Sequence, residues 1–189
     1  MKIILASQSP RRKTLLAEAG FSFDVYSPDV EEIDSGAYSR HIPLINAIRK
    51  ASAAARLFPG DLVIGADTAI EFNGTIIGKP ENMGEARRIL KTLSGQCHRV
   101  ITGVALFGRT RCLETTFSEE SAVCFKPLTE AAIETYLSRV HVLDKAGAYN
   151  IAEHGELLID RVEGPRDNII GLPCEKLSQA LRTAMMLQA

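Results

Sequence analysis

The segment LVIGADTAIEF-NG-TII, residues 62–77, constrains the fold of this chain most strongly. Both arms are rich in apolar and β-branched residues, and Asn73-Gly74 between them is a strong signal for a two-residue hairpin turn. The sequence therefore predicts two adjacent antiparallel strands. The longer strand carries a carboxylate, Asp67, within its apolar run, and Lys79 follows just beyond the shorter strand.

Helices and strands alternate before this hairpin, and strands cluster after it. This pattern is typical of an α/β fold, and it predicts a mixed, twisted sheet with flanking helices. Residues 31–43, EEIDSGAYSRHIP, are polar and rich in turn formers, so we expect a mobile loop there. The predicted helices cover residues 10–20, 44–58, 82–95, 129–140 and 174–187; the predicted strands cover residues 2–5, 21–29, 62–72, 75–77, 98–108 and 112–125, with one more after the Gly-rich loop in 144–164.

The composition bounds the function classes. A chain of 189 residues, 46% hydrophobic, buries a full core as one domain or as two tightly joined lobes, and we expect a single domain over residues 1–189 without a linker. The formal net charge of −1 argues against a protein that wraps duplex nucleic acid or lies on an anionic membrane. No apolar run has the length of a signal peptide or a transmembrane helix, so we expect a cytoplasmic protein.

The cysteines and histidines give no sign of a zinc site. The cysteines lack a CxxC pair, which favours reduced thiols over disulfides. His98 stands at a strand start, where a hydrogen-bonded structural histidine is a more common finding than a catalytic base. Neither of the two glycine-rich phosphate-binding motifs, G-x-G-x-x-G and G-x-x-x-x-G-K-[ST], occurs. The four cysteines are Cys97, Cys112, Cys124 and Cys174.

Two arginines stand where a helix should least favour them. The stretch LASQSPRRKTLLAEAG, residues 5–20, predicts a strand that runs into a helix with Ser9 as its N-cap. Arg11 and Arg12 then lie in the first turn, where the helix dipole is positive and a cation is mildly unfavourable. Two interpretations are equally open from this stretch alone: solvated arginines, or a phosphate cradle shared with Ser9 and Ser7.

Carboxylates and lysines supply the other candidates. Asp67 interrupts an apolar strand, so it lies either at the carboxyl end of that strand or in a costly buried position. It can hold a divalent cation or orient a water, although an Asp bonded to a nearby loop backbone is the commoner finding. Glu31 and Glu32 could supply further oxygen ligands, although a pair of acids in a polar loop is most often solvated. Lys50 and Lys79 are possible phosphate contacts. Many cations, a few carboxylates and no evident nucleophile together suit metal-assisted attack of water on a phosphoryl centre.

The order of several short motifs resembles the Maf family of nucleotide pyrophosphatases, over nearly the whole chain. The motifs are ASQSPRR, EE, RKA, GADT, GKP, LSGQCHRVITGVAL, DKAGAY and GLP. The resemblance implies an α/β fold with two lobes around a central cleft, often as a homodimer. It also implies hydrolysis of nucleoside triphosphates to the monophosphate and pyrophosphate with Mg²⁺, Mn²⁺ or Co²⁺, in cytoplasmic nucleotide housekeeping or in a link to division arrest.

The resemblance also implies roles for individual residues. Asp67 would be the catalytic acid that orients or deprotonates water and would also contact the metal, which Glu32 helps to hold. Ser7, Arg11 and Arg12 would line the triphosphate site, and Lys50 and Lys79 would add positive charge there.

The substrate branch follows from the same motifs. SGQCHRVITGV and DKAGAY resemble the branch that acts on dTTP and UTP rather than the branch that acts on 7-methyl-GTP. Arg12 and Thr68 match the arginine and threonine that sense the base in that branch, but Ala152 stands where its glutamine should be. Either Asn150 or Glu153 takes over this role, or selectivity is relaxed.

Two other functions are weighed against this enzyme. The altered loop around Ala152 is also compatible with a nucleotide-sensing regulator of cell division that hardly turns over its ligand. A weak binder of single-stranded nucleic acid is disfavoured, because aromatic residues for base stacking make up only 6% of the chain.

Overall fold

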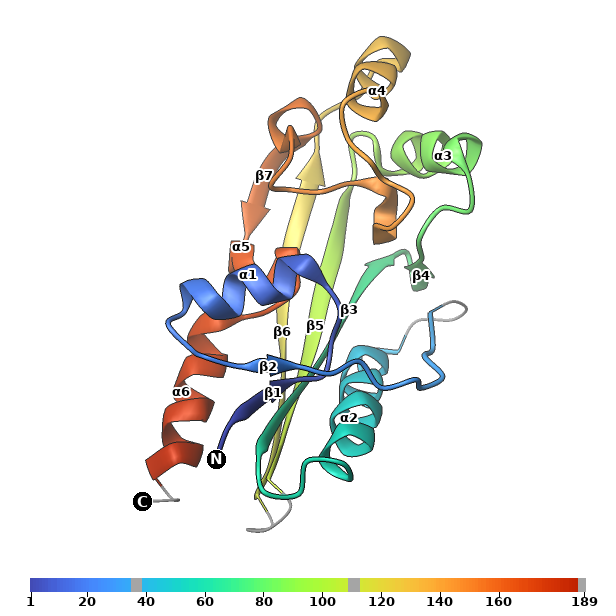
Figure 1. Cartoon of the computed structure of the whole chain (residues 1–189). Helices are drawn as coiled ribbons and strands as arrows, with labels where there is room; N and C mark the ends of the chain where they lie inside the picture. The colour runs from blue at the N-terminus through green and yellow to red at the C-terminus, as the bar shows by residue number, and fades with distance from the viewer. Residues whose placement is uncertain (35–38, 109–112, 187–189) are drawn as a thin grey trace.

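The computed structural model describes residues 1–34, 39–108 and 113–186. A seven-stranded sheet forms its centre, in the order β2-β1-β3-β5-β6-β7 with β4 paired to β3, so the predicted mixed α/β fold is confirmed (Figure 1). β1 pairs in parallel with β2 and β3, and the other pairs are antiparallel. The strands are β1 (Ile3–Leu5), β2 (Asp24–Val25), β3 (Leu62–Phe72), β4 (Thr75–Ile77), β5 (Cys97–Gly108), β6 (Leu113–Phe125) and β7 (Ile159–Glu163). The helices are α1 (Pro10–Glu18), α2 (Ile42–Ala55), α3 (Met83–Leu93), α4 (Glu130–Leu137), α5 (Arg166–Ile170) and α6 (Cys174–Met186), with the short 3₁₀ helices η2 (Ala146–Ala148) and η3 (Gly155–Leu157).

The hairpin of β3 and β4 forms as its turn residues predict. Phe72 and Thr75 are cross-strand partners, and the two residues between them take positive φ angles, 51° at Asn73 and 79° at Gly74. The Gly74 N–H also donates to the Glu71 side chain at 2.7 Å, which satisfies a backbone group of the turn. The turn therefore leads the segment after β4, which carries Lys79, back towards the middle of β3, where Asp67 lies.

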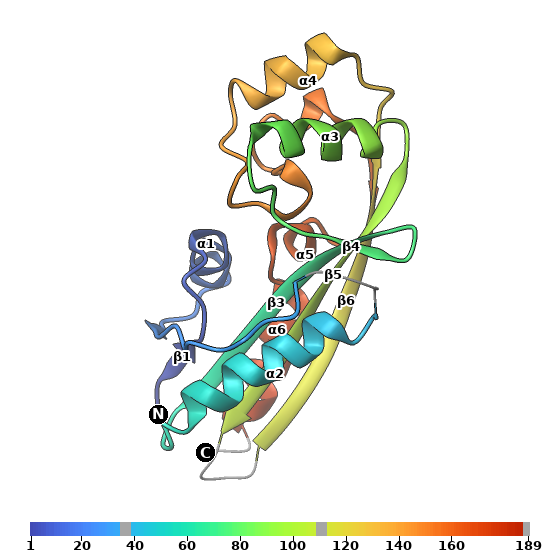
Figure 2. The same ribbon diagram turned by 90° about the vertical axis from the view of Figure 1, so that its right-hand side faces the viewer.

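Helices cover both faces of the lower part of the sheet. Side chains of β1 alternate between the faces, as the two-residue period of a strand requires. Ile3 and Leu5 pack in one cluster with Leu16 of α1 and Leu181 of α6. Ile4 packs in another cluster with the alanines of α2. The sheet thus lies between α1 and α6 on one side and α2 on the other (Figure 2).

Two glycines let α2 lie unusually close to the sheet. A Cβ atom on Gly65 of β3 would stand 2.2 Å from the Ala47 carbonyl oxygen, and one on Gly103 of β5 would stand 2.4 Å from the Leu44 nitrogen. Both distances are far below van der Waals contact, so any side chain at either position would push the helix away. Glycine at these positions therefore sets the distance between α2 and the strand residue Asp67.

The far end of the sheet carries a second cluster, which we call the upper lobe: α3, α4, β7, the segments 126–129 and 138–158 with η2 and η3, and the adjoining ends of β3, β5 and β6 (Figure 1). The rest of the described chain is the lower lobe. α3 and α4 begin at the side-chain caps expected from the sequence, Asn82 and Thr129. Their buried faces meet over Tyr136, Leu90 and Phe125. The predicted arrangement of two lobes is confirmed.

Some elements differ from the expectation. α5 was not predicted, because its five residues are too short for a helical pattern to emerge. β2 takes up only two residues of the expected strand at 21–29. The expected mobile loop at 31–43 falls partly on residues 35–38, which lie outside the described residues.

The expectation of reduced thiols is wrong for two cysteines. Cys97 and Cys124 form a disulfide. Although they are 27 residues apart, the register of β5 and β6 makes them direct cross-strand partners, a proximity that sequence spacing alone does not reveal. Cys174 is free, and burial raises the pKa of its thiol to about 12. Cys112 lies outside the described residues.

Within the described residues, no helix has both the length and the apolar character that a bilayer crossing needs.

Candidate active site

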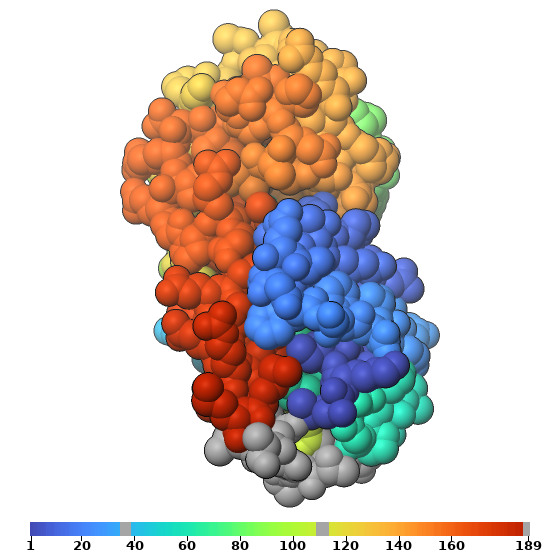
Figure 3. All heavy atoms as spheres, turned by 60° about the vertical axis from the view of Figure 1, so that its left-hand side comes forward, coloured from blue at the N-terminus to red at the C-terminus, as the bar shows by residue number. Residues whose placement is uncertain are grey.

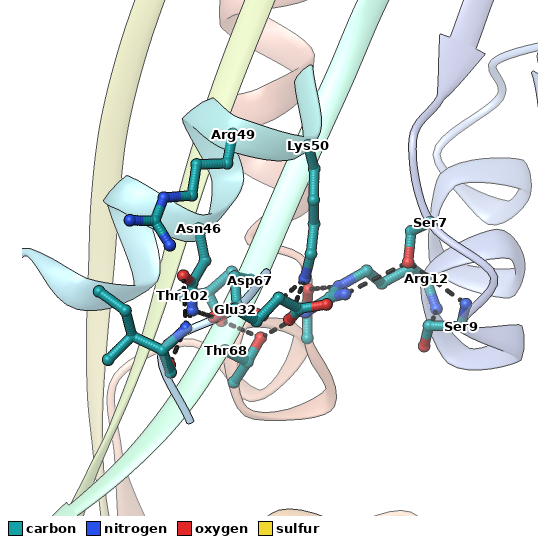
Figure 4. Close-up of polar contacts among 12 residues, drawn as sticks. Ser7, Ser9, Arg12, Glu32, Asn46, Arg49, Lys50, Asp67, Thr68 and Thr102 are labelled. Carbon is teal, nitrogen blue, oxygen red and sulfur yellow. Dashed lines mark hydrogen bonds and ion pairs between the residues drawn. The ribbon is translucent and has the colours of Figure 1, made fainter. Parts of the chain in front are cut away.

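Helix α2 presents two polar side chains to one carboxylate of the sheet (Figure 4). Asn46 and Lys50 are one helical turn apart and therefore lie on the same face. Lys50 Nζ donates to Asp67 Oδ1 at 2.9 Å, and Asn46 Nδ2 donates to Asp67 Oδ2 at 2.9 Å. Both oxygens of Asp67 are thus held, and its side chain is only 14% exposed. Asp67 lies inside β3, opposite Gly103, so it is neither at the carboxyl end of the strand nor fully buried: it is partly buried and lines a cleft.

The same face of α2 fastens the loop segment 31–33. The Ile33 N–H donates to Asn46 Oδ1 at 3.0 Å, and Asn46 Nδ2 donates back to the Ile33 carbonyl at 2.9 Å. Arg49 donates to the Glu31 carbonyl at 2.9 Å. Lys50 Nζ, already bonded to Asp67, reaches the Glu32 carboxylate at 2.6 Å. Two carboxylates therefore converge on one ammonium group (Figure 4).

Arg12 is held by three hydrogen bonds from different parts of the chain. Its Nε donates to the Gly171 carbonyl at 2.8 Å, its Nη1 to Ser7 Oγ at 3.2 Å and its Nη2 to Thr68 Oγ1 at 3.0 Å. A guanidinium group has five N–H donors, so two N–H groups, one on each terminal nitrogen, are left for a ligand. Arg12 is fixed in position before any substrate arrives.

The hydroxyl groups beneath Arg12 form a directional chain. Thr102 Oγ1 donates to the Asn168 carbonyl at 2.9 Å, so its proton is used there. The 2.9 Å contact between the hydroxyls of Thr68 and Thr102 must then be donated by Thr68. Thr68 therefore accepts from Arg12 and donates to Thr102, and this series of hydrogen bonds ends at the Asn168 carbonyl of α5. Each member polarises the next, which strengthens the hold on the arginine.

Burial governs the electrostatics of this region. It lowers the pKa of Arg12 from its usual value, whereas the charge of Asp67 acts in the opposite direction. An arginine remains a cation under these conditions because its ordinary pKa is so high. His98 is 2% exposed, and burial lowers its pKa to about 4, so it is neutral at physiological pH. Its Nε2 pairs with the Tyr149 hydroxyl at 2.8 Å, which confirms the expectation of a structural histidine.

A cleft of about 350 Å³ opens above these side chains, between the two lobes. Figure 3 shows the blue N-terminal segment directly below orange atoms of the upper lobe. The acidic and basic side chains that line the cleft are, among the described residues, Arg11, Arg12, Glu32, Lys50, Asp67, Lys79, Asp144 and Lys145. Apolar lining comes from Ile70, Val100, Tyr149, Ile151, Ile169 and Ile170.

The structure brings most of the predicted site residues to this cleft. Ala152 is different: it is exposed and does not belong to the described residues that line the cleft, although its neighbour Asn150 does. The Ala152 N–H donates to Asn150 Oδ1 at 3.1 Å. The predicted residues that line the cleft are Ser7, Arg11, Arg12, Glu32, Lys50, Asp67, Thr68 and Lys79.

Sequence reasoning missed several residues at the site. Asn46 could have been found, because a polar residue four positions before Lys50 stands on the same otherwise apolar stripe of a helix. Thr102 gave no signal, since its contact with Thr68 depends on the register of β3 and β5. Asp144 and Lys145 belong to the motif DKAGAY, and the family resemblance implies no role for either residue alone.

The donor set suits a small divalent cation. Glu32 and Asp67 already direct one carboxylate oxygen each to a single point of positive charge, Lys50 Nζ. Mg²⁺ in phosphoryl-transfer sites commonly takes one or two carboxylates, with phosphate oxygens and water completing its coordination. Among the described residues, no group of three or more His, Cys, Asp or Glu side chains is placed to hold a metal without such help. The two carboxylates therefore fit a divalent ion that takes its remaining ligands from outside these side chains.

Comparison of the sequence with known proteins identifies its family. The family model described as Maf-like protein matches residues 2–184. The chain belongs to the Maf family. It is 41% identical over 183 residues to a dTTP/UTP pyrophosphatase of Bacillus anthracis, which covers 96% of this chain and 94% of the relative. A dTTP/UTP pyrophosphatase of Akkermansia muciniphila is 42% identical over 180 residues, with 95% and 94% covered.

Among solved structures, the Ham1 protein of Staphylococcus aureus aligns over 98% of this Maf chain and 100% of its own, with 17% sequence identity and a TM-score of 0.48.

Proposed function

We propose that this Maf protein is a nucleoside triphosphate pyrophosphatase, an enzyme that hydrolyses its substrate to the monophosphate and pyrophosphate. The observation that carries the proposal is the fixed carboxylate Asp67, which faces a cleft lined by Arg12 and Lys50. Its relatives of 41% and 42% identity are named dTTP/UTP pyrophosphatases, which supports this activity and does not favour a regulator without turnover. We place the activity in the cytoplasm, where these nucleotides are made and used.

The reaction we propose is attack of water at the α-phosphorus. Asp67 orients the water and accepts its proton, and its oxygens are held in place for this task by Asn46 and Lys50. The new bond joins the water oxygen to the α-phosphorus. The bond from that phosphorus to the oxygen bridging to the β-phosphate breaks, and its electron pair leaves with pyrophosphate.

Positive charge at the cleft assists both halves of this step. Arg12 directs its two remaining N–H groups to phosphate oxygens from a position that needs no rearrangement. Arg11 lies in the first turn of α1, where backbone N–H groups also attract an anion. The sequence analysis left open whether these arginines are solvated or form a cradle, and we propose the cradle with Ser7.

A divalent metal belongs to the proposal. Glu32 and Asp67 would hold it, and the metal would supply charge neutralisation on the phosphates and a lower pKa of water. Lys50 bridges the two carboxylates in the structure and would keep them together beside that ion.

The preferred substrates we propose are dTTP, UTP and related pyrimidine nucleotides. Thr68 and Arg12 are bonded to each other at the cleft, and the aliphatic and aromatic lining offers a surface for the base. Asn150 lines the cleft and Ala152 does not, so Asn150 is the better candidate to contact the base edge. Its Oδ1 accepts from the Ala152 N–H and its Nδ2 donates to Glu153, so the amide keeps one lone pair and one N–H for a pyrimidine edge.

A nucleotide panel tests the function. Purified protein is incubated with dTTP, UTP, dCTP, dATP and 7-methyl-GTP, each with Mg²⁺ or Mn²⁺, and released pyrophosphate is measured. We expect release from dTTP and UTP above all others. Absence of release from every nucleotide would refute the enzyme, and tight calorimetric binding of dTTP in that case would identify a nucleotide-sensing regulator instead.

A further inference from the structure

The upper wall of the cleft carries a buried lysine that the proposed reaction has not yet used. Lys145 lines the cleft, and its side chain is 8% exposed. Lysine is almost never buried to this degree unless its charge is paired. Its Nζ donates to the His141 carbonyl at 2.6 Å and to Asp144 Oδ1 at 2.8 Å. An ammonium group has three N–H donors, so one remains for a ligand.

The backbone brings a second lysine to the same wall. The Gly147 N–H, two residues after Lys145, donates to the Gly78 carbonyl at 3.0 Å, one residue before Lys79. Gly147 has a φ of 73°, and a Cβ there would stand 2.5 Å from Ile70 Cδ1. The join between the two segments therefore depends on glycine. It fixes both lysine-bearing segments against β3.

The two walls face each other with complementary charge. Asp144 is about half exposed; partial burial acts to raise the pKa of its carboxyl, but the hydrogen bond and charge of Lys145 outweigh this effect, and Arg11 on the opposite wall adds a smaller lowering. Asp144 thus holds the ammonium group of Lys145 at the mouth between the lobes, opposite the first turn of α1.

We propose that Lys145 binds the β- and γ-phosphates of the substrate and hence the departing pyrophosphate, with Asp144 as its positioning residue; this inference rests on the proposed function. The lower wall holds the α-phosphate between Asp67 and Arg12, so the leaving group extends toward the upper wall. When the bond between the α-phosphorus and the bridging oxygen breaks, the electron pair stays on pyrophosphate. Lys145 keeps its proton and stabilises that negative charge through its third N–H.

A lysine in the same lobe serves as a matched control for the possibility that Lys145 has only a structural role. Lys126 also donates its ammonium group to a backbone carbonyl, that of Glu156, at 2.8 Å. It is exposed and does not belong to the described residues that line the cleft. Lys126→Met therefore removes a lysine-to-carbonyl bond without touching the proposed phosphate site.

The test measures binding of inorganic pyrophosphate and of the nucleoside monophosphate by calorimetry, with Mg²⁺, to the whole chain. We expect Lys145→Met to raise the Kd of pyrophosphate about tenfold or more, because a charge-assisted contact is lost, and to leave the Kd of the monophosphate within about twofold. Lys145→Gln retains a donor for the His141 carbonyl but no charge, and should show the same selective loss. Lys126→Met should change neither Kd. In turnover, Lys145→Met should lower kcat about 10²-fold, more than it raises KM.

Binding needs no turnover, so the two proposals fail separately. Failure to release pyrophosphate from any nucleotide refutes the function, whereas the calorimetry still reports on Lys145. Unchanged pyrophosphate affinity in Lys145→Gln, or an equal loss for pyrophosphate and monophosphate, would overturn the role of Lys145. Failure of the wild-type protein to bind pyrophosphate would also overturn the role of Lys145.

Discussion

The two walls of the cleft are built differently. On the lower wall, the reactive side chains are held mainly by residues from distant parts of the chain: Arg12 is bonded to Gly171 and Thr68 as well as to nearby Ser7, and Asp67 is bonded to Asn46 and Lys50 of α2. On the upper wall, Lys145 is held by its own neighbours in sequence, the His141 carbonyl and Asp144. Lys79 is exposed.

This difference separates two tasks. Groups that must be placed accurately relative to the attacked phosphorus gain from a preformed network, since no rearrangement is then needed in the transition state. Groups that receive a leaving pyrophosphate must also let it go, and locally held lysines suit that task. The comparison predicts that substitutions on the lower wall act mainly on catalysis and those on the upper wall on release and binding of product.

The largest effect should come from Asp67→Asn. The amide keeps the shape of the side chain but cannot accept a proton from water, so we expect kcat to fall about 10³-fold while the Kd for nucleotide changes little. Single-turnover assays and calorimetry measure the two quantities. Turnover close to that of the wild type would remove Asp67 from its proposed role and end the distinction between the walls.

Arg12→Lys should have the next largest effect. A single ammonium group cannot replace a planar fork that bonds to three partners and still offers two N–H groups. We expect kcat/KM to fall about 10²-fold. Arg88→Lys on the exposed surface of α3 is the matched control and should be neutral. Equal kinetics in the two variants would mean that the network around Arg12 does not contribute to catalysis.

Low pH should destabilise the folded protein through His98, a buried residue of the upper lobe. His98 has a pKa of about 4 in the folded chain and an ordinary value of 6.5 when unfolded. The unfolded chain therefore takes up the proton first, and the free energy of unfolding falls as pH drops below about 6.5. Between about pH 8 and about pH 5 this group alone should remove about 2 kcal/mol.

Urea unfolding curves at both pH values measure this loss. His98→Gln keeps a polar partner for Tyr149 without the titration, and should reduce the difference between the two pH values. An undiminished difference would assign the acid sensitivity to other groups.

Thr102→Val should have the smallest effect. Valine has the shape of threonine but leaves the Asn168 carbonyl and the Thr68 hydroxyl without their partner, so we expect a loss of about 1–3 kcal/mol in the free energy of unfolding. The KM should rise a few-fold, because Arg12 is then held less firmly. Thr183→Val, on the exposed side of α6, is the control. If Thr102→Val left the KM unchanged, only Arg12 and its direct hydrogen-bond partners would contribute to substrate binding.

Local patterns in the sequence were sufficient for features that depend on neighbours along the chain. The turn at Asn73-Gly74, the Ser9 cap and the alternation of elements were predicted because a few adjacent residues determine them. The disulfide of Cys97 and Cys124 and the contact of Thr68 with Thr102 were not, because both follow from strand register. The roles of the site residues stay predictions, and so does the single domain without a linker.

Because α2 lies so close to the sheet, two residues that have no reactive group influence the chemistry of the site. A single added methyl at Gly65 or Gly103 would displace the helix that carries Asn46 and Lys50, and an assay would report it as if the carboxylate itself had been altered. We therefore expect substitutions at these two glycines to be tolerated as poorly as substitutions at the residues that contact the nucleotide.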